Sequence, residues 1–147
     1  MNMKHTVKAA LLCLAVGAAP AAAFAETAKD VVSKAVTEIF VNGDTDAIDT
    51  YFAEDYIQHN PRIQSGRAVI KELFSHAPAN FKYEPGMIIG DGDLVAVHAR
   101  ITGFGPKTLV GVDIFRVENG LIAEHWDVLQ EEVLETASGE PMFTPMQ

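Results

Sequence analysis

Three side chains suited to acid–base chemistry interrupt two apolar segments near the end of the chain. Asp113 stands in the segment before the turn sequence at residues 118–120, and His125 and Asp127 stand in the segment after it. Burial raises the pKa of a carboxyl group, a second carboxylate raises it further, and a neighbouring imidazolium opposes both effects. Such a group can act as a general acid or base near neutral pH. The pattern therefore predicts an acid–base site, or else a hydrogen-bonded polar cluster that only fixes the strand register.

The face of the sheet on which these three side chains lie depends on the length of the turn between the two segments. A three-residue turn with Gly120 in the left-handed region sets Asp113 opposite His125. One face of the hairpin then holds Asp113, Phe115, Ala123, His125 and Asp127. A two-residue turn shifts the pairing by one residue and sets Asp113 beside Trp126. His125 and Asp127 then turn to the opposite face. We expect the three-residue turn, and the site assignment depends on it.

Two further histidines are weaker candidates. His59 precedes the Asn60-Pro61 turn and fits either a pocket or a loop histidine that caps backbone groups. His98 shares a strand face with Ala96 and Arg100, which fits either a cavity wall or a dimer surface. We place both among the expected pocket residues. That set is His59, His98, Phe115 and Trp126.

No metal or cofactor is expected. No two of the histidines at positions 59, 98 and 125 have the close spacing of a metal-binding motif. The chain also has no glycine-rich phosphate loop and no nucleophile elbow.

The elements that must position these residues change type along the chain. Helical spacing of apolar residues predicts a helix that starts at Thr27 with a capping box and ends at Asn42-Gly43. A short helix capped by Asp44 or Thr45 and a third helix capped by Ser65 follow. Extended segments are expected at 56–59, 81–89, 94–102, 108–117 and 121–129. Helices followed by an antiparallel meander predict an α+β fold.

Both faces of the expected strands are partly apolar. Val110, Val112 and Ile114 alternate with Leu109 and Phe115 in one strand, so neither face is polar throughout. One face should pack on the helices. The other is expected to meet a second copy of the chain, because a solvated face is usually more polar.

The first 25 residues have the pattern of a secretory signal peptide. Lys4 and Lys8 precede an apolar run, and Ala23-Phe24-Ala25 provides a cleavage site. The chain is acidic, with a formal charge of −9 that becomes −11 without the two lysines. This charge argues against nucleic acid and, after cleavage, against an anionic membrane surface as partners. We expect a periplasmic or secreted protein with a domain at 26–136 and an irregular tail at 137–147.

Several sequence segments resemble the SnoaL-like polyketide cyclase family of the NTF2-like superfamily. They are YIQHNP at 56–61, a following Gly66, GDLVAVH at 92–98 and DIFRVENGLIAEHWDV at 113–128. The resemblance implies an α+β cone in which a strongly curved antiparallel sheet wraps around helices and leaves a deep pocket. It also implies dimerisation through the sheet. The type enzymes catalyse an intramolecular aldol cyclisation without metal or cofactor.

The resemblance also suggests roles for individual residues. Asp127 matches the aspartate that acts as acid and base in the type cyclases, and Asp113 stands where they carry a histidine. We therefore expect Asp127 to be the principal acid/base and Asp113 and His125 to tune it. Three hypotheses follow: a cofactor-independent enzyme acting next to a carbonyl, a non-catalytic periplasmic binder of a small ligand, and a dimeric interaction module. The fold alone does not decide among them.

Overall fold

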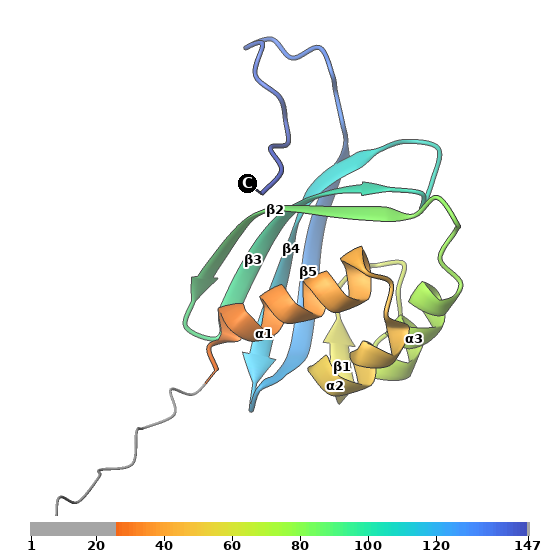
Figure 1. Cartoon of the computed structure of the whole chain (residues 1–147), viewed down its shortest axis with the longest axis vertical. Coiled ribbons are helices and arrows are strands. Elements are labelled where there is room, and N and C mark those ends of the chain that lie inside the picture. Colours follow the sequence, from red (N-terminus) through yellow and green to blue (C-terminus); the bar gives the residue numbers. More distant parts are fainter. Residues whose placement is uncertain (1–25, 147) are drawn as a thin grey trace, which may run out of the picture.

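The computed structural model describes residues 26–146, in which the helices precede most of the sheet (Figure 1). The helical elements are α1 (Ala28–Ala35), the π-helix η1 (Val36–Val41), the 3₁₀-helix η2 (Thr45–Ala47), α2 (Ile48–Tyr51) and α3 (Arg67–Ser75). The strands are β1 (Phe52–Gln58), β2 (Lys82–Asp91), β3 (Leu94–Thr102), β4 (Leu109–Glu118) and β5 (Leu121–Glu131). This order confirms the expected α+β fold.

The helix ends follow local side-chain chemistry. Thr27 and Asp30 form the expected capping box, with Asp30 N–H donating to Thr27 Oγ1 over 3.2 Å and Thr27 N–H donating to Asp30 Oδ2 over 3.1 Å. Asp44, rather than Thr45, caps η2. The expected cap of α3 by Ser65 is wrong. Gly66 is the cap residue, and Ser65 Oγ instead accepts a hydrogen bond from the backbone of Gln58 over 3.0 Å.

The five strands form one sheet in the order β1-β5-β4-β3-β2. All neighbours are antiparallel except β1, which runs parallel to β5. In Figure 1 the helices lie against one face of the sheet, and the sheet bends around them. We call this the inner face. The core between the two layers includes Val32, Ile39, Ile48, Phe52, Val95, Val97 and Ile122.

The hairpin between β4 and β5 differs from both expected registers. The turn has two residues, Asn119 and Gly120, with φ of 52° and 80°, and pairs Glu118 with Leu121. Positive φ at both positions is what a tight hairpin turn requires. A β-bulge then leaves Ala123 without a partner, because Val117 pairs with Ile122 but Arg116 pairs with Glu124.

The bulge reverses the effect of the shorter turn. Asp113 lies opposite Asp127, and Phe115 lies opposite His125, so the expected direct pairing of Asp113 with His125 is wrong. The four side chains nevertheless share the inner face and line one cavity, as the three-residue turn predicted. Without the bulge, Glu124 would enter the core, which is costly for an unpaired charge.

The tail crosses the opposite, outer face of the sheet. Residues 137–146 contain no helix or strand and run over this face in Figure 1. Phe143 is only 3% exposed and packs on His98, with ring centroids 5.7 Å apart. The tail therefore covers part of the apolar surface that the sequence exposes on the outer face. No helix within residues 26–146 is long and apolar enough to cross a membrane.

Candidate active site

A cavity of about 360 Å³ lies between α3, η1 and the inner face of the sheet. This volume is equivalent to roughly twelve water molecules and falls within the range of small-molecule sites. The polar side chains that line it are Tyr56, Gln58, Asn60, Arg62, Tyr83, Asp113, His125 and Asp127. The other lining residues are Phe40, Phe52, Ile63, Ile70, Leu73, Phe74, Phe81, Ile101, Phe104, Leu109, Phe115 and Leu129.

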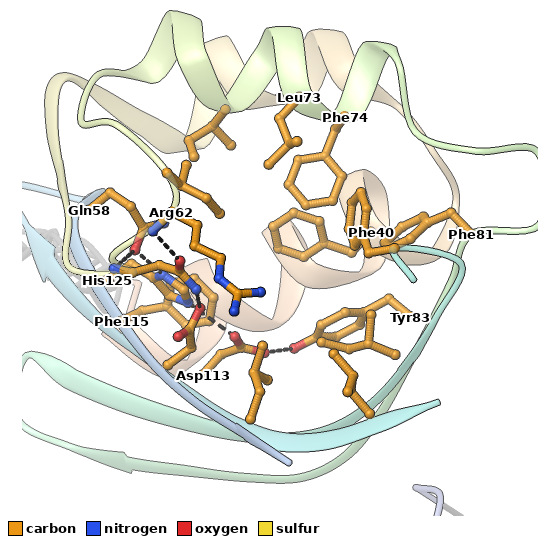
Figure 2. Close-up of a pocket in the computed structure, with 18 of the residues that line it drawn as sticks. Phe40, Gln58, Arg62, Leu73, Phe74, Phe81, Tyr83, Asp113, Phe115 and His125 are labelled. Atoms are coloured by element: carbon orange, nitrogen blue, oxygen red, sulfur yellow. Dashed lines mark hydrogen bonds and ion pairs between the residues drawn. The ribbon is translucent and has the colours of Figure 1, made fainter. Parts of the chain in front are cut away.

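The cavity has an aromatic end and a polar end. Phe74 on α3 contacts Phe40, Phe81 and Phe104, with ring centroids 4.8, 5.6 and 5.8 Å away. In Figure 2 the labelled phenylalanines of this group gather on one side, and Gln58 and His125 lie on the other. An occupant with an apolar body and a polar group therefore matches the two ends.

Asp113 and His125 are the core of the polar end. They are 6% and 7% exposed, and His125 Nε2 lies 3.1 Å from Asp113 Oδ1. The other oxygen of Asp113, Oδ2, accepts a hydrogen bond from the Tyr83 hydroxyl over 2.6 Å (Figure 2). These contacts satisfy both carboxylate oxygens of a buried acid.

The hydrogen-bond network assigns the protons on His125. Gln58 Oε1 accepts from the backbone N–H of Asn60 over 2.9 Å, so the Gln58 oxygen, not its nitrogen, faces His125 Nδ1 at 3.0 Å. Nδ1 must therefore donate. The contact between Nε2 and Asp113 then requires one more proton, on either atom. The Asp113–His125 pair thus shares a proton and carries no net charge in either form.

Asp127 adds a second carboxylate beside this pair. Its Oδ2 accepts a hydrogen bond from Asn60 Nδ2 over 2.7 Å, and its side chain is only half-buried. Asn60 is oriented by the turn that follows it, because Asn60 Oδ1 accepts from the backbone N–H of Arg62 over 2.9 Å. Asp127 is therefore held at the cavity wall as a hydrogen-bond acceptor.

The same three residues could also coordinate a cation. Asp113, His125 and Asp127 each offer one ligand atom, and these atoms lie within 4.8 Å of one another. A histidine with two carboxylates suits several divalent metals. Motif spacing along the sequence did not reveal this group, because its members come from two strands.

Two tyrosines near the cluster stay protonated. Burial is the main cause that raises the pKa of Tyr83 well above its ordinary value, and the Asp113 carboxylate adds to the rise. Burial also raises the pKa of Tyr56, with further contributions from Asp113 and Asp127. Tyr83 is therefore a hydrogen-bond donor to Asp113 at neutral pH.

Three of the expected pocket residues lie outside the cavity. Trp126 points to the outer face, because side chains alternate along β5 between His125 and Asp127. His59 stacks on Trp126, with ring centroids 4.6 Å apart, and pairs with Glu124 over 2.7 Å. His98 alternates with the buried residues of β3 and also faces outward. The expectation that His59, His98 and Trp126 line the main pocket is wrong, whereas Phe115 does line it.

Sequence patterns did not identify several residues of the site. Gln58 and Asn60 flank His59 in the turn motif, but the motif does not show that their side chains face the cavity. Tyr83 gave no signal, because it reaches Asp113 from β2, 30 residues earlier in the chain. Arg62 follows Asn60-Pro61 directly and lies just beyond the YIQHNP motif at 56–61, so it was not singled out.

Comparisons with solved structures place this architecture among NTF2-like folds. An NTF2-like protein of unknown function from Cytophaga hutchinsonii has a TM-score of 0.63 at 18% identity, over 71% of this chain and 90% of that one. A "putative ketosteroid isomerase" from Kribbella flavida has 0.62 at 20% identity, over 82% and 90%. A "putative polyketide cyclase" from Acidithiobacillus ferrooxidans has 0.60 at 19% identity, over 73% and 90%. These similarities show an NTF2-like fold.

The sequence identifies the family within that fold. The model of the SnoaL-like domain matches residues 33–125, so the chain belongs to the SnoaL-like domain family. This confirms the resemblance drawn from the sequence motifs. No curated protein matches the chain.

Proposed function

We propose that the protein is an acid–base enzyme of the aldol cyclase or isomerase type that acts on a small organic molecule without a cofactor. The observation that carries this proposal is the position of Asp127 beside the Asp113–His125 pair at the polar end of an otherwise apolar cavity. Two structural neighbours are named a "putative polyketide cyclase" and a "putative ketosteroid isomerase", and these names support the reaction class.

The geometry supports a proton transfer next to a carbonyl group. Asp127 has one oxygen held by Asn60, which leaves the other to take a proton from a carbon beside the carbonyl. The C–H electron pair then moves to the carbonyl oxygen. The proton shared by Asp113 and His125 would stabilise that oxygen if the pair turned it from their mutual contact toward the substrate. The enolate then attacks a second carbonyl in a cyclase, or regains a proton at another carbon in an isomerase.

Proton exchange tests the proposal without knowledge of the natural substrate. The wild-type protein should accelerate the exchange of the α-hydrogens of 2-tetralone in D₂O, measured by NMR. Asp127→Asn should lower the rate about 10²-fold or more, because it removes the proton acceptor while Asn60 can still donate to the new side chain. Asp55→Asn, a change on the exposed part of β1, is the matched control.

A non-catalytic binder is the alternative. It would show no wild-type exchange above the buffer rate, and Asp127→Asn would keep ligand affinity within a few-fold. Equal exchange rates in the wild type and Asp127→Asn would remove Asp127 from the proposed role.

We also propose that the outer face mediates a homodimer. Val128 and Ile89 on this face are 73% and 57% exposed, which supports an apolar contact surface beyond the part covered by the tail. Light scattering at micromolar concentration should give about twice the monomer mass. Val128→Glu should lower that mass toward the monomer, and a monomeric wild type would refute the proposal. A dimeric interaction module with an unused cavity would retain the dimer but bind no small ligand.

Export to the periplasm or the exterior is a further part of the proposal. The supporting signal lies in residues 1–25, outside the residues that the structure describes. N-terminal sequencing of the native protein should start near Glu26, and a product that retains Met1 would contradict export by cleavage.

A further inference from the structure

Arg62 is a cation that lines the cavity. The structure describes four arginines, and Arg67, Arg100 and Arg116 each form an ion pair. No carboxylate within residues 26–146 lies within ion-pair distance of Arg62. Its guanidinium reaches into the cavity in Figure 2, between the polar cluster and the aromatic rings. Arg62 is the only lysine or arginine among the lining residues.

The backbone at Arg62 is held by the turn that also orients the candidate base. The Arg62 backbone N–H donates to Asn60 Oδ1 over 2.9 Å, and the same Asn60 side chain donates to Asp127. The Arg62 side chain therefore starts next to the residue that holds Asp127.

Arg62 is exposed to solvent, and Asp127 already accepts a hydrogen bond from Asn60. A ligand that covers the Arg62 guanidinium removes water from it, and a desolvated guanidinium without an anion is unfavourable. A ligand carboxylate restores a partner and can accept two parallel hydrogen bonds.

We propose that the natural ligand is an organic carboxylate with a flat, aromatic or similarly apolar body, and that Arg62 selects it by binding the carboxylate. The body lies among Phe40, Phe74 and Phe81, at the aromatic end. This inference rests on the proposed function for the identity of the site and adds the substrate class. Arg62 is a specificity residue and takes no part in the proton transfer.

A pair of probes that differ in charge tests the inference. We expect the wild type to bind 2-naphthoate about tenfold more tightly than 2-naphthamide in calorimetry at neutral pH, as for a partly exposed charge-assisted hydrogen bond. The two probes have the same ring system and nearly the same shape. Arg62→Gln should remove this preference by weakening naphthoate binding while leaving naphthamide affinity unchanged. NMR shifts of Ile63 and Ile101 should locate both probes in the cavity.

Lys34→Gln is the control for net charge. It removes one positive charge on α1, where Lys34 pairs with Glu26 over 2.6 Å, and should leave the preference unchanged. The inference is overturned if Arg62→Gln keeps the preference, if the wild type does not distinguish the probes, or if it binds neither. The proton-exchange assay of the wild type separates this result from the proposed function. If the wild type prefers 2-naphthoate but catalyses no proton exchange, the ligand class is supported and the proposed enzymatic activity is refuted.

Discussion

Replacement of Asp113 separates two roles of its carboxyl group, its hydrogen bonds and the proton that it shares with His125. In Asp113→Asn the new Oδ1 can accept from Tyr83, and the new Nδ2 can donate to Nε2 of a neutral His125. Every buried polar group in the cluster keeps a partner. Asp113→Ala removes both contacts and leaves the Tyr83 hydroxyl and His125 Nε2 without partners in a site that is more than nine-tenths buried.

The expected free energies of unfolding differ accordingly. Loss of one member of a buried pair costs about 3–5 kcal/mol, because the remaining polar groups stay desolvated. For a domain of this size such a loss lowers Tm by roughly 10–20 °C. Asp113→Asn should cost about 1 kcal/mol or less, because both hydrogen bonds of the side chain are kept and only the shared proton is lost.

Two measurements decide between the roles. Urea denaturation gives the free energy of unfolding for both variants, and imidazole ¹⁵N shifts give the state of His125. Asp113→Asn should show neutral His125 with the proton on Nδ1, as the Gln58 contact requires. Equal losses of stability in the Asn and Ala variants would mean that the shared proton, and not hydrogen bonding as such, stabilises the pair. A loss below about 1 kcal/mol in the Ala variant would mean that water already reaches the pair.

Further predictions concern pH, packing and the turn. All three tyrosines should titrate above their ordinary pKa of 10.0 in the folded protein, because burial is the first cause of the rise at Tyr51, Tyr56 and Tyr83; ultraviolet absorbance at 295 nm should show a midpoint of tyrosinate formation above that pH. Since the folded pKa values are raised, the stability that they contribute is complete below pH 10 and is lost as the pH rises through the folded values, and a native tyrosine that titrates normally would contradict this. Gly111→Ala should cost about 1–3 kcal/mol of stability, because its Cβ would lie 2.5 Å from Val128 O, whereas Gly105→Ala has no atom within 4 Å and should be neutral in the same thermal melts. Deletion of Ala123 should leave the hairpin in a regular ladder with His125 still on the inner face, and loss of the His125 contact to Asp113 in NMR spectra would refute the bulge.

Local patterns were sufficient for most of the fold. Alternating apolar residues and the capping box of Thr27 and Asp30 predicted the strands and the first helix within a few residues, because both depend on near neighbours. The register of the last hairpin was harder. Asn119 and Gly120 form a two-residue turn. With that turn, a bulge at Ala123 is needed to bury His125 in place of Glu124.

The site could be predicted only where its residues share a hairpin. Asp113, His125 and Asp127 came from one motif, and their common face was correct. The partners that assign their protons, Gln58 and Tyr83, approach from β1 and β2. Their contacts depend on how the sheet curves around the helices, which no spacing along the chain reports. Trp126 and His98 were placed on the wrong face for a different reason, because alternation along β5 and β3 turns both side chains outward.

The stacking of Trp126 on His59 makes tryptophan fluorescence a probe of the outer face of the sheet. The chain contains one tryptophan, and its ring is nearly parallel to the imidazole, with an angle of 5° between the planes. Its emission therefore responds to the ionisation of His59 and to anything that covers β5 from outside. Because the indole points away from the cavity, a ligand bound there can leave the emission unchanged while a contact between two chains alters it. Fluorescence can thus follow self-association separately from ligand binding in one untagged sample.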